Sequence, residues 1–198
     1  FQDYAYFSSY STSWLDHAKR YCTEATQRYG IDESRFVVEI ASNDGYLLRN
    51  FVEQTVPVLG IEPASNVAEV AEENGIPTLN EFFGRTLADR LSSRDIRADL
   101  LIGNNVLAHV PDLNDFVSGL QTLLSPTGVI TMEFPHLLRL MEENQFDTIY
   151  HEHFSYFSLL TVRRIFAHHG LKIFDVQELP THGGSIRIHA CQSHNDDW

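Results

Sequence analysis

Cysteine, basic residues and long apolar runs are all scarce in this 198-residue sequence. Only Cys22 and Cys191 are present, at opposite ends, which excludes a cysteine-ligated zinc cluster within the chain and a disulfide framework, and fits a reducing cytoplasm. No run approaches the roughly 20 apolar residues of a membrane helix. Because the formal charge is −13, the chain repels polyanions. Nucleic acid and membranes are therefore unfavourable partners, and small molecules are favoured.

A regular alternation of short β-branched runs and helical stretches begins at about residue 34. This pattern predicts one α/β domain with a mostly parallel sheet and helices on both faces. The last two strands are close enough in sequence to form a hairpin, so one strand of the seven is expected to be antiparallel. The expected strands are 35–42, 56–63, 76–80, 98–105, 127–135, 171–180 and 185–192.

Residues 1–33 lie outside this alternation. They are expected to form one amphipathic helix, "SWLDHAKRYCTEATQRYG", preceded by an aromatic arm. The arm is either a lid over the functional site or a patch that packs against a helix. The α/β domain proper, which would hold the functional site, is then expected over residues 34–198.

The turn "EIASNDG" after the first strand indicates the kind of ligand. A dinucleotide fingerprint would have glycines where Ala41 and Asn43 stand, and no Gly-Lys-Ser/Thr follows to make a phosphate loop. The pattern E-x-A-x-N-x-G, ending at Gly45, is a variant of the turn of class I methyltransferases. It predicts their Rossmann-like fold and a site for S-adenosylmethionine.

Polar residues at the strand ends agree with this cofactor. Glu39 is placed to sit near its ammonium group, and Glu62, about twenty residues on, to accept its ribose hydroxyls. Asn104 and Asn105, after the fourth strand, would offer amide groups. His109 lies in the loop that runs alongside the transferred methyl in such enzymes. The alternative is that these residues are merely polar strand termini.

The segment "YHEH" at 150–153 allows three interpretations. A metal site is disfavoured because this is not the H-E-x-x-H helix of metalloproteases. A solvated loop is disfavoured because aromatic residues flank the segment, so we expect its polar groups to face a cavity. Acid–base chemistry is favoured, since histidine titrates near neutrality. Such a cluster suits methylation of a carbon beside a ketone, which needs a base and donors for the enolate.

Six stretches are distinctive when taken together: "DYAYFSSYSTSWLDHAKRY", "EIASNDGYLL", "GIEPASNVA", "GNNVLAHVPDLNDFV", "MEFPHLL" and "QFDTIYHEHFSYFSLLTVRRIF". They resemble the sugar C-methyltransferases of antibiotic deoxysugar pathways, along the whole chain. The resemblance implies methylation of C3 in a dTDP-linked 4-ketosugar. It implies His153 as the base, with Glu152 orienting it or sharing its role, and Tyr150, His109 and Tyr4 holding the keto sugar and its enolate.

The resemblance also implies a three-part protein. Members of that family carry a cysteine-rich zinc-binding domain before this region and a sugar-nucleotide domain after it, so the present sequence corresponds to the central domain. Two other functions stay open from the residues alone. One is an O- or N-methyltransferase for a small metabolite, and the other is a cofactor-binding module that is inactive without the missing domains.

Overall fold

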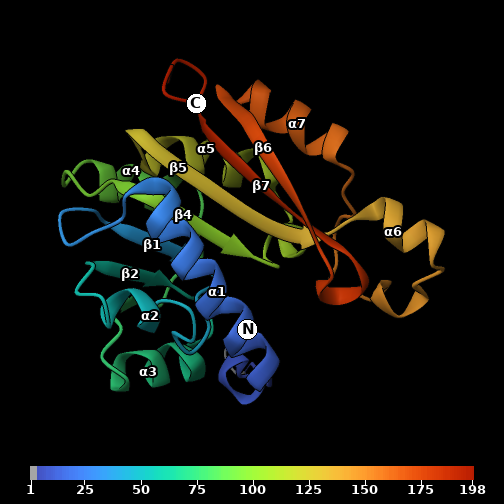
Figure 1. The fold of residues 1–198 in the computed structure, drawn as a ribbon, viewed down its shortest axis with the longest axis horizontal. Helices are drawn as coiled ribbons and strands as arrows, with labels where there is room; N and C mark the ends of the chain where they lie inside the picture. Colours follow the sequence, from blue (N-terminus) through green and yellow to red (C-terminus); the bar gives the residue numbers. More distant parts are fainter. Residues whose placement is uncertain (1–3) are drawn as a thin grey trace.

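The computed structural model describes residues 4–198, so the first three residues of the expected arm lie outside the described residues. The described chain forms a seven-stranded sheet in the order β3-β2-β1-β4-β5-β7-β6 (Figure 1). In this sheet β7 alone runs in the direction opposite to the other six strands. The predicted fold class is therefore confirmed. The strands are β1 (Val37–Ile40), β2 (Val58–Ile61), β3 (Thr78–Leu79), β4 (Ala98–Asn104), β5 (Leu124–Pro135), β6 (Leu171–Leu179) and β7 (Ser185–Gln192).

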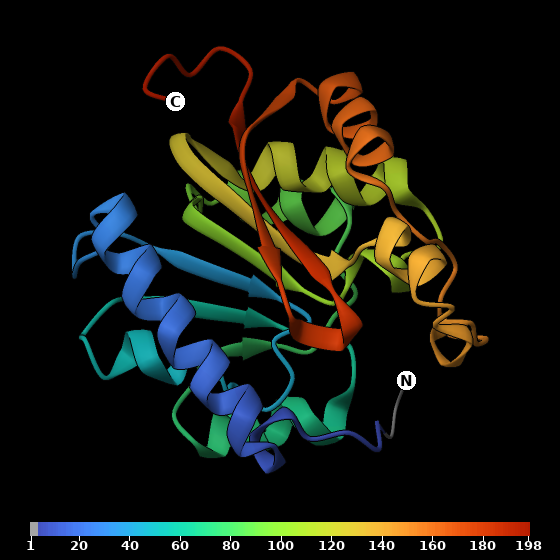
Figure 2. The same ribbon diagram turned by 45° about the vertical axis from the view of Figure 1, so that its right-hand side comes forward.

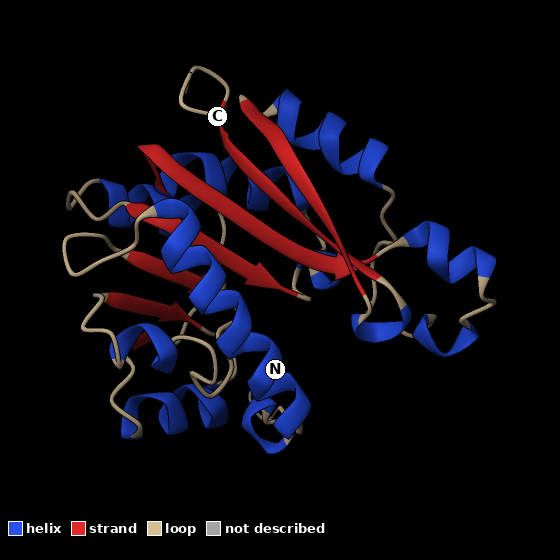
Figure 3. Cartoon of the chain, in the orientation of Figure 1, coloured by secondary structure: helices blue, strands red, loops and turns tan. Residues whose placement is uncertain are grey.

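Helices cover both faces of the sheet (Figures 1 and 3). The long α1 crosses one face, while α4 and α5 lie behind the other. The α-helices are α1 (Thr12–Tyr29), α2 (Arg49–Val52), α3 (Ser65–Glu73), α4 (Arg85–Ser92), α5 (Leu113–Leu123), α6 (Leu137–Glu142) and α7 (Leu159–His168). Short 3-10 turns are η1 (Ser8–Tyr10), η2 (Leu107–His109), η3 (Phe146–Thr148) and η4 (Thr181–Gly183). The sequence did not predict α6, which projects beyond the sheet.

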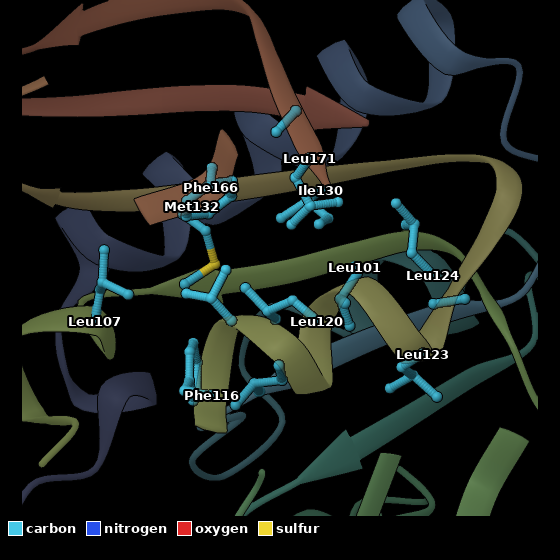
Figure 4. Close-up of a cluster of buried hydrophobic side chains, with 14 of the residues drawn as sticks. Leu101, Leu107, Phe116, Leu120, Leu123, Leu124, Ile130, Met132, Phe166 and Leu171 are labelled. Atoms are coloured by element: carbon cyan, nitrogen blue, oxygen red, sulfur yellow. The ribbon is translucent and has the colours of Figure 1, made fainter. Parts of the chain in front are cut away.

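Two hydrophobic cores result because alternate strand residues point to opposite faces. In β1, Val38 and Ile40 join the core under α4 and α5, whereas Val37 joins the core under α1. Figure 4 shows part of the first core, in which leucines of α5 pack against side chains of the neighbouring strands. This alternation places Glu39 on the α1 face, at 0% exposure.

The order of the strands reverses at β1. The chain moves from β1 to β2 and β3 on one side, then returns to place β4 on the other side. In open α/β sheets, ligands bind at the carboxyl ends of the strands beside such a reversal. The turn after β1 and the loop after β4 both lie there. No helix within residues 4–198 is long and apolar enough to cross a bilayer.

Candidate active site

The turn after β1 is held in a conformation that glycine normally supplies. Ala41 and Asn43 have φ values of 56° and 51°, and Gly45 follows at 77°. A side chain at Gly45 would also meet Ile76, because a Cβ there would lie 2.7 Å from Cγ1 of that residue. Non-glycine residues in the left-handed region are uncommon, with asparagine the best tolerated. The turn thus keeps the methyltransferase geometry with only its last glycine.

Glu62 fixes this turn from the end of β2. Its carboxylate accepts hydrogen bonds from the backbone N–H of Asn43 at 3.0 Å and of Ala64 at 2.8 Å. Burial raises the pKa of Glu62, and these two hydrogen bonds partly oppose that shift. Each carboxylate oxygen has a second lone pair, so the group can still accept from a ligand hydroxyl.

Of the buried oxygen atoms near this edge that have no hydrogen-bond partner among the described residues, four belong to residues predicted to bind the cofactor. They are both carboxylate oxygens of Glu39 and the side-chain oxygens of Asn104 and Asn105. The pKa of Glu39 is raised well above its usual value by burial and by the nearby carboxylates of Glu62 and Asp44. Unpaired buried acceptors are costly. They fit a ligand that brings an ammonium group and hydroxyls, as S-adenosylmethionine does.

The YHEH segment lies at the same edge of the sheet. It follows the carboxyl end of β5 through α6 and η3, and the backbone N–H of Phe154 donates to the carbonyl of Ala108 at 2.8 Å. Ala108 lies in η2, just beyond the carboxyl end of β4. The cofactor turn and the acid–base cluster therefore share one rim of the sheet.

His153 is oriented by the backbone. Its Nδ1 lies 2.7 Å from the carbonyl oxygen of Thr148, which accepts a hydrogen from that nitrogen. This contact assigns the proton of a neutral ring to Nδ1 and leaves Nε2 with a free lone pair. Thr148, rather than Glu152, thus makes the orienting contact at Nδ1.

Aromatic rings surround His153. The ring centroids of Tyr150, His109 and Tyr156 lie 4.4, 4.8 and 5.8 Å from its own. The pKa of His109 is lowered by burial and by His153, although Glu152 opposes the shift. A neutral His109 beside His153 avoids repulsion when His153 takes up a proton.

Tyr4 reaches the same cluster from the other end of the chain. Its pKa is raised by burial and then by Glu152, Tyr150 and Glu62, so these groups lie within electrostatic range of its hydroxyl. Of the five residues predicted for catalysis, His109 and Tyr150 are in ring contact with His153, Glu152 lies between Tyr150 and His153 in the chain, and Tyr4 is near enough for Glu152 to raise its pKa.

The expected shelter of the YHEH segment is wrong in part. Three of the flanking side chains are mostly exposed, namely Phe146 at 74%, Ile149 at 56% and Phe154 at 61%. Of the flanking aromatic residues, only Phe157 is buried in the core. The segment is an irregular connection on the rim, so some of its flanking side chains point into the core and others point into solvent. His151 also points outward, with 88% of its side chain exposed. Within residues 4–198, no group of three or more His, Cys, Asp or Glu is arranged to hold a metal.

A second polar cluster at this rim was missed by sequence reasoning. Glu133 of β5 accepts from His17 at 2.9 Å, from Arg187 at 2.5 Å and from Thr181 at 2.9 Å. Burial alone would raise the pKa of Glu133, but the bond from His17 and the charge of Arg187 lower it. These donors line a cavity of about 540 Å³ between α1 and η4. Glu133 and Arg187 were missed because they interrupt strands that otherwise appear apolar.

Comparison with known proteins agrees with the fold and the turn. Residues 14–176 match the family described as a methyltransferase domain. The structure is similar to PH0226 of Pyrococcus horikoshii OT3, with a TM-score of 0.74, 15% identity and 94% of each chain covered. It is also similar to magnesium protoporphyrin IX methyltransferase of Synechocystis PCC 6803 with bound SAH, with a TM-score of 0.70, 14% identity, and 90% and 83% covered.

Two curated proteins are similar in sequence. The C-methyltransferase NovU of Streptomyces niveus is 37% identical over 99% of this chain and 47% of its own length. The ubiquinone biosynthesis O-methyltransferase of Bartonella bacilliformis is 25% identical over 48% of this chain and 38% of its own length. The chain thus spans about half, or less, of the curated relatives it matches.

The fold and the turn after β1 define a class I methyltransferase, the class that uses S-adenosylmethionine as methyl donor. The chain belongs to the methyltransferase-domain family, because that family matches 14–176.

Proposed function

We propose that this chain is the methyl-transfer domain of a sugar C-methyltransferase that acts on C3 of a dTDP-linked 4-ketosugar in cytoplasmic deoxysugar and antibiotic biosynthesis. The observation that carries the proposal is the contact between Nδ1 of His153 and the Thr148 carbonyl, which leaves Nε2 of the neutral ring unprotonated, on the rim that also holds the cofactor turn. The similarity to NovU, a C-methyltransferase, supports transfer to carbon.

His153 is the proposed base. Its Nε2 takes the proton from C3, and the C–H electron pair moves into the ketone to give an enolate. The Thr148 carbonyl favours this step, because it accepts from Nδ1–H and stabilises the imidazolium that forms. Glu152 adds a nearby negative charge. The proton then passes from His153 to solvent.

Hydroxyl groups are the proposed donors to the enolate oxygen. Burial and then Glu152 raise the pKa of both Tyr4 and Tyr150, so both hydroxyls keep their protons at neutral pH. Protonated phenols aimed at a developing oxyanion stabilise it without a net positive charge. His109 completes the polar wall beside them.

The cofactor residues have separate roles in this proposal. When bound, S-adenosylmethionine would supply an electrophilic methyl group for C3 and would leave as S-adenosylhomocysteine. Glu39 would pair with the ammonium group, Glu62 would accept the ribose hydroxyls, and Asn104 and Asn105 would accept from the remaining polar hydrogens. The turn from Ala41 through Asn43 to Gly45 lets the backbone approach the ligand.

Loss of a deuteron from C3 tests the proposed base. The full-length protein is incubated with a C3-deuterated dTDP-4-ketosugar and S-adenosylhomocysteine, and washout is followed by mass spectrometry. His153→Ala is expected to slow washout by about 10²- to 10⁴-fold, the usual contribution of general base catalysis. The exposed neighbour gives the matched control, since His151→Ala should leave washout unchanged. Normal washout in His153→Ala would rule out this base.

The product separates this function from its alternatives. A methyl group on oxygen or nitrogen would favour a small-molecule methyltransferase, for which the partial similarity to the ubiquinone O-methyltransferase is the supporting observation. Calorimetry with donor and with dTDP-sugar addresses the third alternative. Donor binding without sugar-nucleotide binding by residues 1–198 would favour a module that is inactive by itself.

A further inference from the structure

Two asparagine side chains hold the N-terminal arm by pairing with its backbone. The amide of Asn66 accepts from the N–H of Tyr4 at 2.9 Å and donates to its carbonyl at 2.8 Å. The amide of Asn43 donates to the carbonyl of Tyr6 at 3.0 Å and accepts from the N–H of Ser8 at 2.9 Å. Each amide thus makes two bonds, much as a neighbouring strand would.

Both asparagines stand on the cofactor half of the molecule. Asn43 lies in the turn after β1, where its backbone N–H donates to Glu62. Asn66 is in the first turn of α3, four residues after Glu62. Asp44 makes a third attachment of the arm, because its carboxylate accepts hydrogen bonds from both the N–H and the hydroxyl of Ser9. The arm is therefore fixed to the residues that shape the donor site.

The docked arm carries Tyr4 to the acceptor half. Figure 2 shows it running from the start of α1 toward the side where α6 and the following segment lie. There Tyr4 comes within electrostatic range of Glu152 and Tyr150, and also of Glu62. A side chain near a chain terminus samples many positions unless hydrogen bonds fix its backbone, because ordering it costs conformational entropy.

We propose that Asn66, assisted by Asn43, is a positioning residue that holds Tyr4 against the acceptor. The docked arm then fixes the position of the Tyr4 hydroxyl, which binds the enolate, relative to the donor turn. This inference rests on the proposed function for the role of Tyr4. It assigns the Asn43 side chain to the arm and only its backbone to the cofactor. Asn66 has no contact with Glu39, and its loss should leave donor binding nearly intact.

Hydrogen exchange tests the docking without any turnover. In the full-length protein, deuterium uptake of the peptide that contains residues 4–11 is measured by mass spectrometry. Asn66→Ala is expected to raise its exchange rate by about tenfold or more, since a bond that protects the Tyr4 amide is lost. Asn74→Ala, at the exposed end of the same helix, is the matched control and should leave it unchanged. Equal uptake in Asn66→Ala and wild type would overturn the proposal.

Kinetics test whether docking acts through Tyr4. Asn66→Ala is expected to lower kcat by about tenfold and to change the donor KM by less than about twofold. Asn66→Asp keeps the acceptor for the Tyr4 N–H and loses the donor to its carbonyl, so it should fall between Ala and wild type. In a Tyr4→Phe background the same Asn66→Ala change should cost nothing further. Additive losses would show a general structural role and overturn the proposal.

The two tests separate this inference from the proposed function. Faster exchange in Asn66→Ala, in a full-length protein that methylates no ketosugar, would support the docked arm and contradict the sugar chemistry. Unchanged exchange, in a protein that methylates the sugar at C3, would contradict the docked arm alone.

Discussion

The donor half and the acceptor half of the site are built differently. At the donor turn, Glu39, Asn43 and Asp44 are buried, the strand pairing holds the backbone of Glu39, and the backbone N–H of Asn43 donates to Glu62. At the acceptor segment, Phe146 and Phe154 are mostly exposed and the backbone lies in short turns beyond β5. The donor turn is thus buried within the described chain, whereas the acceptor segment presents apolar side chains to its surroundings. Cofactor binding and acceptor chemistry should therefore respond to different substitutions.

Substitutions of Phe154 and Phe157, three residues apart in the acceptor segment, are expected to have the largest difference in effect on stability. Phe157 is 3% exposed and packs on Phe134, with ring centroids 5.9 Å apart. Phe157→Ala is expected to cost about 3 to 5 kcal/mol of unfolding free energy, because it empties a core site. Phe154→Ala should change it by less than about 0.5 kcal/mol. Urea denaturation measures both, and equal losses would contradict the division of this segment into core and surface residues.

The unpaired carboxylate of Glu39 is expected to lower the stability of the cofactor-free protein and to raise its affinity for the methyl donor. Glu39→Gln removes a buried acid without emptying the site, so the cofactor-free protein is expected to gain about 1 kcal/mol. Donor affinity should fall by about 10- to 100-fold, because the partner of the ammonium group is lost. Thermal unfolding without ligand and calorimetry with S-adenosylmethionine measure the two effects. A loss of stability together with unchanged affinity would contradict this role.

Donor binding should also depend on pH through the same carboxylate. The folded-state pKa of Glu39 is raised, so the cofactor-free protein holds a proton there that the unfolded chain releases near pH 4.5. Its contribution to stability is complete below that value and is lost as pH rises through the folded pKa. Donor binding favours the charged form, so affinity should rise with pH across this window. In Glu39→Gln, this dependence, measured by calorimetry, should disappear.

Local sequence was sufficient for the fold and for the positions of Glu39 and Glu62 at strand ends. The strands predicted at 171–180 and 185–192 match β6 and β7, because β-branched residues favour the strands and a turn with two glycines separates them. Glu39 and Glu62 could be placed because each lies within one residue of the carboxyl end of a strand, and a strand fixes where its end lies. Their roles toward the cofactor stay predictions.

The acceptor half could not be predicted to the same depth. The partner of His153 is the backbone of Thr148, and backbone contacts leave no signature in side-chain type. Tyr4 and Glu152 are distant in the chain, so only tertiary packing brings Tyr4 near enough for Glu152 to raise its pKa. The shelter of the segment was overestimated because aromatic content does not tell which way a loop side chain points.

The smallest expected effect lies at Ala41, where the turn departs from the glycine pattern. Its φ of 56° lies in the left-handed region, which costs an alanine about 1 to 2 kcal/mol. Ala41→Gly removes that strain and adds about 0.5 to 1 kcal/mol of unfolded-state entropy, so a net gain of about 0.5 to 1 kcal/mol is expected. The same change at Ala68, inside α3, should instead lose about 1 kcal/mol. Opposite signs in urea denaturation would establish that conformation, rather than composition, sets the requirement for glycine in this turn.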